Sequence, residues 1–141
     1  MADPSADVIF ALMAKLRMTA AVTDLVGTSI YDPPPQDDPS VKSPYISLGP
    51  TDIRRDDVTC EGGQSVFIQF DVWAWGAGIA KSSVLVRRIS DAVAEALHDQ
   101  VLTLPANRLS NIEHRSTEIM RDPGGIINHG VVQFWASVQR A

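Results

Sequence analysis

Apolar residues near the start of the chain recur at the spacing of an α-helix. Asp3 and Pro4 precede them as an N-cap followed by a proline in the first turn, so we expect a helix that begins at Asp3 or Ser5. A second, short helical turn is predicted at residues 20–26, and residues 30–31 are expected to form a brief extended piece. The apolar stripe of the first helix consists of Val8, Ile9, Leu12, Met13 and Leu16.

Four later segments have the composition of β-strands: residues 45–55, 64–75, 109–121 and 127–139. Glycine-containing turns separate the first from the second and the third from the fourth, which predicts two antiparallel hairpins. Between the hairpins, residues 79–98 carry apolar side chains on one helical face. The order helix, hairpin, helix, hairpin predicts an α+β fold in one domain, residues 1–141, with a mainly antiparallel four-stranded sheet and two helices packed on one face.

Side-chain alternation along the second and fourth strands separates an apolar face from a mixed one. All three tryptophans, Trp73, Trp75 and Trp135, fall on the mixed face among Gln, Ser and Asp residues. A polar face that carries indoles is typical of a protein–protein contact. Two alternatives keep the tryptophans inside the subunit: loops fold over them, or a β-bulge shifts the register and returns one of them to the core. The apolar face, expected to meet the helices, consists of Val66, Ile68, Phe70, Val72, Ala74, Val132, Phe134, Ala136 and Val138.

Charged residues of both signs gather near the tip of the first predicted hairpin. Arg54 and Arg55 are followed by Asp56, Asp57 and Glu61. Such charges keep an edge strand from aggregating, or they form an arm whose arginines pair with carboxylates across a subunit contact. These five residues and the three tryptophans are the candidate interface residues.

Charge and motifs limit the functions open to the chain. The net charge of −5 argues against a nucleic-acid binder with a wholly basic surface, but it is compatible with DNA passing through an acidic channel. Residues 76–82 lack the glycine spacing of a phosphate loop. Cys60 has no neighbouring histidine, and His98, His114 and His129, the last expected in a turn, lack metal-ligand spacing. No cofactor, metal or catalytic residue is predicted, and no apolar run reaches the ~18 residues of a membrane span.

Several segments occur in a familiar order: "LVGTSIYDPPP", "SPYISLGP", "FIQFDVWAWGAG" leading into "LVRRISDAVAEAL", and "HGVVQFWASV". In this order and spacing, which cover nearly the whole chain, the sequence resembles the tail-completion proteins of long-tailed bacteriophages. These proteins are also called tail terminators or head–tail joining proteins, and they have counterparts in gene transfer particles.

The resemblance implies a structural role. Such proteins form a ring, commonly a hexamer, that caps the tail tube and offers a surface to the neck or head–tail connector protein. DNA passes through the lumen without specific binding, and no membrane, cofactor or catalytic residue is involved. The expected location is the neck of a virion or phage-like particle, assembled in the bacterial cytoplasm.

Two other functions stay open at this point. A neck adaptor or assembly-regulating binding module would be monomeric until it meets its partner, whereas a ring subunit would form a discrete oligomer. A small enzyme would need a concave pocket with convergent polar groups.

Overall fold

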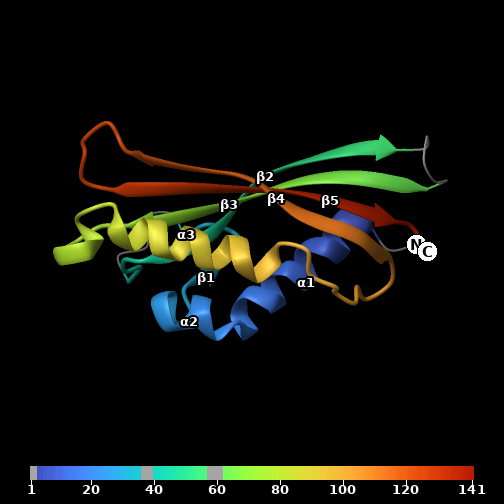
Figure 1. The fold of residues 1–141 in the computed structure, drawn as a ribbon, viewed down its shortest axis with the longest axis horizontal. Coiled ribbons are helices and arrows are strands. Elements are labelled where there is room, and N and C mark those ends of the chain that lie inside the picture. The colour runs from blue at the N-terminus through green and yellow to red at the C-terminus, as the bar shows by residue number, and fades with distance from the viewer. Residues whose placement is uncertain (1–2, 36–39, 57–61) are drawn as a thin grey trace.

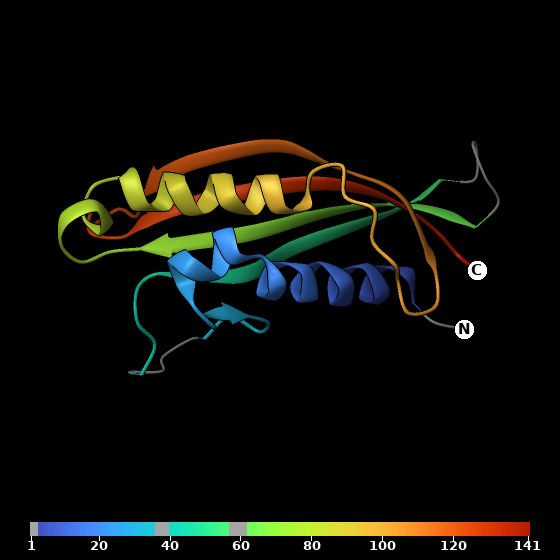
Figure 2. The same ribbon diagram turned by 60° about the horizontal axis from the view of Figure 1, so that its bottom comes forward.

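A computed structural model describes residues 3–35, 40–56 and 62–141 of the protein. Within these ranges three helices lie against one face of a five-stranded sheet, as Figures 1 and 2 show. Residues 78–80 add a short 3₁₀ turn, η1. The helices are α1 (Pro4–Met18), α2 (Ala20–Val26) and α3 (Val84–Leu97), and the strands are β1 (Ile30–Tyr31), β2 (Tyr45–Asp56), β3 (Gly63–Ala74), β4 (Arg108–Arg121) and β5 (Asn128–Gln139).

The α+β architecture and the placement of the helices on one face agree with the prediction, but the sheet and helix counts do not. The strand order is β1-β2-β3-β5-β4. β1 pairs with β2 in parallel, Ile30 beside Ile46, whereas all other pairings are antiparallel. The helical turn predicted at residues 20–26 and the extended piece predicted at residues 30–31 are α2 and β1. The predicted architecture of four strands and two helices did not count them, because two residues are too short to show a strand period and α2 has only seven residues.

The core lies between the helices and the sheet. α3 packs across β3, β4 and β5, and α1 lies beside it, toward the β2 side of the sheet (Figure 2). Every residue of the predicted apolar face is buried, and so is the predicted face of α3. Because each of these side chains is removed from water, their burial supplies most of the driving force for this packing.

Two β-bulges lie at the same level on either side of the central strands. β3 and β5 pair without a break, from Gly63 opposite Gln139 to Ala74 opposite Asn128. By contrast, β2 shifts register at residues 49–50 and β4 at residue 115, and both shifts flank the cross-strand pair of Gln69 and Gln133. A further shift, at residue 110, lies near the start of β4. Bulges increase local twist, and Figure 1 shows the strands crossing in projection near the middle of the sheet.

Two aspartates at the start of α1 accept hydrogen bonds from backbone N–H groups, one of them locally and the other from a distant loop. The Asp3 carboxylate accepts from the backbone N–H of Ser5 at 2.8 Å and of Ala6 at 3.2 Å, which is the predicted N-cap. The buried Asp7 carboxylate accepts from the backbone N–H of Ala106 at 2.9 Å and of Asn107 at 2.7 Å. The segment before β4 is thereby held against the first turn of α1.

Candidate functional site

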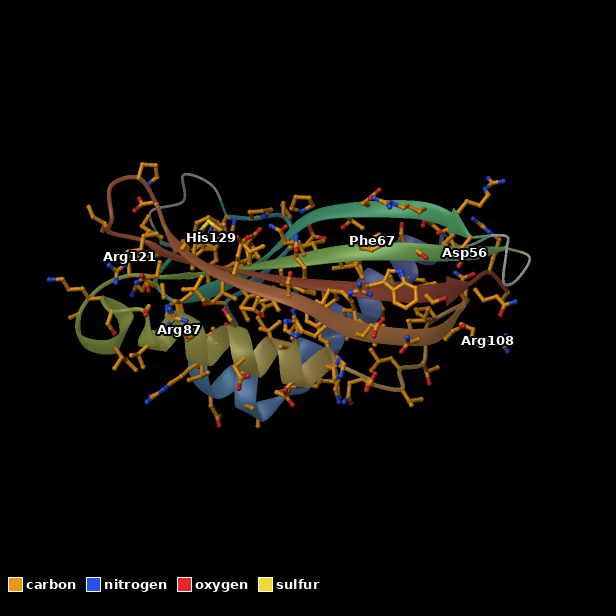
Figure 3. The ribbon with its side chains drawn as sticks, turned by 45° about the horizontal axis from the view of Figure 1, so that its top comes forward. Asp56, Phe67, Arg87, Arg108, Arg121 and His129 are labelled. Carbon is orange, nitrogen blue, oxygen red and sulfur yellow. The ribbon has the colours of Figure 1, made fainter. Side chains whose placement is uncertain are left out.

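The open face is the side of the sheet turned away from the helices, and Figure 3 shows Phe67 and His129 in its two different halves. Trp73 and Trp135 project from this face, because the unbroken β3–β5 register keeps the alternation that the sequence predicts. The register shifts in β2 and β4 therefore return no tryptophan to the core. The open face consists of Tyr45, Ser47, Asp52, Arg54, Ser65, Phe67, Gln69, Asp71, Trp73, Glu113, Ser116, Glu118, Met120, His129, Val131, Gln133, Trp135 and Ser137.

An aromatic cluster of Tyr31, Tyr45, Trp73, Trp75 and His129 occupies one end of the open face. The Trp73 indole stacks on the His129 imidazole, and Tyr45 lies against both indoles, with ring centroids 6.4 Å from Trp73 and 6.0 Å from Trp75. The Trp73 Nε1–H donates to Ser47 Oγ at 3.2 Å. Two of the three candidate tryptophans are therefore packed against neighbours within the subunit.

A chain of polar side chains crosses the middle of the open face. His129 Nε2 lies 2.7 Å from Asp71 Oδ1, and Gln69 Nε2 donates to the same oxygen at 2.9 Å. Gln133 Nε2 donates to Gln69 Oε1 at 3.2 Å, and Ser116 Oγ donates to Gln133 Oε1 at 2.9 Å. These bonds join β3, β4 and β5, and they give the buried Asp71 carboxylate two partners.

The Asp71 carboxylate also affects the pKa of the neighbouring Tyr45 side chain. Burial raises the pKa of Tyr45, and the negative charge of Asp71 and the nearby Tyr31 raise it further. Tyr45 therefore stays neutral at physiological pH and serves as an amphipathic wall of the aromatic cluster.

Trp135 lies in the other half of the open face, apart from the aromatic cluster. It stands directly opposite Phe67 on β3 and Glu113 on β4. The Arg54 guanidinium carbon lies 5.0 Å from the centroid of the Phe67 ring, and Arg54 Nε is 3.0 Å from Asp52 Oδ2. We call Trp135, Phe67, Arg54 and Asp52 the Trp135 patch.

A hollow of about 370 Å³ lies beside the Trp135 patch, where the two bulges open the sheet. Arg54 and Arg115 stand among its lining residues, with the amides of Gln69 and Gln133. Arg115 NH1 lies 3.4 Å from Glu113 Oε1, and Arg54 already pairs with Asp52, so both guanidinium groups have a carboxylate partner. The two arginines therefore give the hollow no unpaired positive charge.

The predicted charged hairpin is only partly described. Arg54 projects from the open face, and the exposed Arg55 alternates to the helix side, so the two arginines do not act on one surface. Asp56 ends β2, at the same end of the sheet as the start of β4 (Figure 3). Asp57 and Glu61 lie outside the described residues, and so does Cys60.

Of the histidines, His129 occupies a different place from the one expected, whereas His98 ends the second predicted helix as expected. His129 lies in β5 rather than in a turn. The turn spans residues 122–127 and is closed by a hydrogen bond from the Asp122 N–H to the Ile127 carbonyl. His98 ends α3 and accepts the backbone N–H of His114 at 3.1 Å on Nδ1. Within the described ranges no three His, Cys, Asp or Glu side chains are grouped as metal ligands. In the same ranges no helix has the length and apolar character needed to cross a bilayer.

Asp71, Tyr45 and His129 were not among the predicted site residues. The alternation rule already places Asp71 and His129 on the open face, but their contact depends on the register between β3 and β5, which the sequence pattern leaves open.

The chain was compared with known proteins. Residues 10–139 match the family described as tail completion protein gp17. The chain belongs to this family. The family is one of structural phage tail proteins, as the resemblance of the sequence segments implied. No curated protein matches the chain.

The fold of this tail completion family member also occurs in a solved assembly. A chain in the structure described as "Virion of native gene transfer agent (GTA) particle" superposes with a TM-score of 0.79 at 25% sequence identity. The match covers 99% of each chain, so it includes both halves of the sheet and the helices.

Proposed function

We propose that this protein is a structural subunit of a ring that caps the tail tube and joins it to the head or neck of a phage or phage-like particle. DNA passes through the lumen of the ring without specific binding. The protein carries out no catalysis and needs no cofactor in this role. Its partners are further copies of itself, the tail tube protein and the head–tail connector or neck protein.

One observation carries this proposal: a chain within a gene transfer agent virion shares the fold over the full length of this protein. The family match over residues 10–139 supports the tail end as its place in the particle. A fold alone does not define a function, but here fold, family and the unlike surfaces of the subunit agree.

A ring is closed by head-to-tail contacts, so each subunit needs two different surfaces for its neighbours and further surfaces for tube and neck. The open face supplies one such surface. Trp73 and Trp75 shape it from within the aromatic cluster, whereas Trp135 is half-buried with Phe67 beside it. We assign the Trp135 patch to contact with another protein of the particle, since tryptophan and arginine dominate such contacts.

The negative net charge of the subunit is compatible with a channel through which DNA passes. With a net charge of −5, the surface does not attract phosphates as a whole. Arg54, Arg55 and Asp56 add charges of both signs at one end of the sheet, and Asp57 and Glu61 follow them in the sequence. We place this end of the hairpin at a subunit contact.

Light scattering after size exclusion, over a range of concentrations, tests the ring. We expect a discrete oligomer, and electron microscopy should show it as a ring. Added to polymerising tail tube protein of the same particle, the ring should stop tube growth. A chain that stays monomeric at every concentration and binds the neck protein alone would support the adaptor alternative instead.

Trp135→Ala tests the open face separately. We expect this variant to keep its thermal stability but to cap tubes or bind neck protein about tenfold more weakly, as for an interface hot spot. Val101→Ala is the matched control, because Val101 is 99% exposed on the loop between α3 and β4, away from the open face. Unchanged capping and neck binding by Trp135→Ala would remove the Trp135 patch from the contact.

A further inference from the structure

An apolar groove runs between α1 and β2 on the helix side of the sheet. Its volume is about 790 Å³. Three large apolar side chains stand open to solvent along it: Phe10 is 66% exposed, Met18 84% and Ile53 48%. Isolated exposed apolar residues are ordinary, but a contiguous groove of them marks a contact site. Ile9, Met13 and Leu48 also line it.

The groove continues into an unpaired strand edge. β1 covers only Ile46 and Ser47 of β2, so from Leu48 to Arg55 the outer edge of β2 has no strand neighbour among the described residues. Such an edge presents a row of backbone donors and acceptors that accept an added strand. An unpaired edge beside an apolar groove thus offers both backbone pairing and side-chain burial to one extended segment.

The other edge strand of the same sheet fits this description of the segment. β4 spans fourteen residues, Arg108–Arg121, and it has no strand neighbour on its outer edge within the described part of the chain. On this edge the Ile112 carbonyl accepts the Asp99 N–H at 2.9 Å and the His114 N–H donates to His98 Nδ1 at 3.1 Å, so the open stretch of β4 runs from Ser116 to Arg121. Through the antiparallel series β2, β3, β5 and β4, the two edge strands run in opposite directions. When one copy is placed beside the next with the sheet continuing, β4 therefore meets β2 in antiparallel orientation, which is the more stable pairing.

We propose that β4 of one copy adds to the β2 edge of the next, and that side chains on the helix side of β4 enter the α1–β2 groove. This inference rests on the proposed ring and specifies the contact that closes it. The two edges are different surfaces, so the same contact repeats around the ring and covers the open stretches of β2 and β4.

The side chains at the two edges suit this contact. His114, Thr117 and Ile119 lie on the helix side of β4, opposite the buried face of β5. In a continued sheet they extend the apolar layer toward the groove. On the open face, β4 supplies Glu118, and β2 supplies Arg54, whose ion pair with Asp52 is exposed to solvent.

Charges placed in the groove test the contact. Phe10→Lys and Ile53→Lys should raise the concentration at which the ring forms by about tenfold or more, since each puts an ammonium group into an apolar contact. Both side chains are well exposed in the subunit, so we expect the variants to stay folded by circular dichroism. Val101→Lys, at a 99% exposed position outside the groove, should assemble normally.

Pairs of introduced cysteines test whether β4 of a neighbouring copy is the strand that lies beside β2. In a Cys60→Ser background, Thr51→Cys protein is mixed with protein carrying a cysteine at Thr117 or Ile119, all on the helix side of their strands. Oxidation should link the two variants at one of these β4 positions. Ser116→Cys is the matched control, because its side chain projects from the opposite face and should not link.

The outcomes separate this inference from the proposed function. A ring that forms equally well in Phe10→Lys and Ile53→Lys, or that links two Thr51→Cys copies to each other, would keep the ring and overturn the β4-to-β2 contact. A wild-type chain that stays monomeric even on the ends of purified tail tubes would overturn both.

Discussion

The indole of Trp73 lies nearly parallel to the imidazole of His129, with planes 9° apart and ring centroids 3.8 Å from each other. This stack joins β3 to β5 at a position where the two residues are directly opposite each other. Asp71 fixes the orientation of the imidazole from two residues away on β3, at 2.7 Å. The aromatic end of the open face is therefore built as part of the subunit, although it faces away from the core.

Trp73→Ala should lower the free energy of unfolding by about 2 kcal/mol. It removes half-buried aromatic surface, the stack on His129 and the hydrogen bond to Ser47. Chemical denaturation of the unassembled subunit measures the loss. Trp135→Ala should lose less than about 1 kcal/mol in the same measurement. Equal losses in the two variants would contradict the separation of the two tryptophans.

Asn128→Ala should lower the free energy of unfolding by about 2 kcal/mol, because it removes a buried side-chain amide together with its hydrogen bonds. The Asn128 side-chain N–H groups donate to three consecutive backbone carbonyls, of residues 80–82, at 3.0, 3.2 and 3.1 Å. Its Oδ1 accepts from Arg121 Nε at 3.0 Å. Asn111→Ala, at an exposed position of β4, is the control and should change stability little. Thermal unfolding curves of the two variants measure the difference in stability.

Ser90→Ala should raise the free energy of unfolding by about 1 kcal/mol. Ser90 of α3 is fully buried, and its Oγ has no hydrogen-bond partner among the described residues. Gly130→Ala should have the opposite effect, because its new methyl group would collide with this hydroxyl. In the double variant the loss should be smaller than in Gly130→Ala alone. Additive effects in this double-mutant cycle would show that the two residues do not meet.

Acid should weaken the attachment between α1 and the loop before β4. Burial alone raises the pKa of Asp7, but hydrogen bonds from the backbone of Ala106 and Asn107 and from the Asn107 side chain outweigh burial and hold the pKa below its usual value. A lowered carboxyl pKa stabilises the fold above the ordinary aspartate pKa of about 3.9, and this contribution is lost as the pH falls below it. Asp7→Asn should therefore be less stable than wild type near neutral pH, with the difference shrinking in acid.

Thermal unfolding of both proteins across the acid range measures this effect. Asp24→Asn, at an exposed position of α2, is the matched control and should run parallel to wild type. A constant difference between Asp7→Asn and wild type at all pH values would mean that the charge of Asp7 does not contribute.

Local patterns predicted most of the fold. The N-cap at Asp3, the buried face of α3 and the two faces of β3 and β5 follow from periodicity and capping chemistry, which act over a few residues. The predicted second helix extended too far at its start, since residues 78–80 form a 3₁₀ turn and α3 begins at Val84.

The features that the sequence did not predict depend on contacts between distant residues. Asp7 bonds to residues about one hundred positions away, and no local pattern marks such a partner. The bulges in β2 and β4 become visible only once each strand is aligned with its neighbour. For the same reason the sequence placed three tryptophans on one face but did not separate Trp135 from the aromatic cluster.

The length of the central strands has a mechanical consequence. β3 and β5 span twelve residues each and pair along their whole length, from the aromatic cluster to the end that carries the charged hairpin. Their hydrogen bonds lie perpendicular to the strands. A pull between the two ends of the subunit therefore loads these bonds in shear, all at once, instead of peeling them apart one by one. In a particle under tension, the subunit would resist extension along this axis.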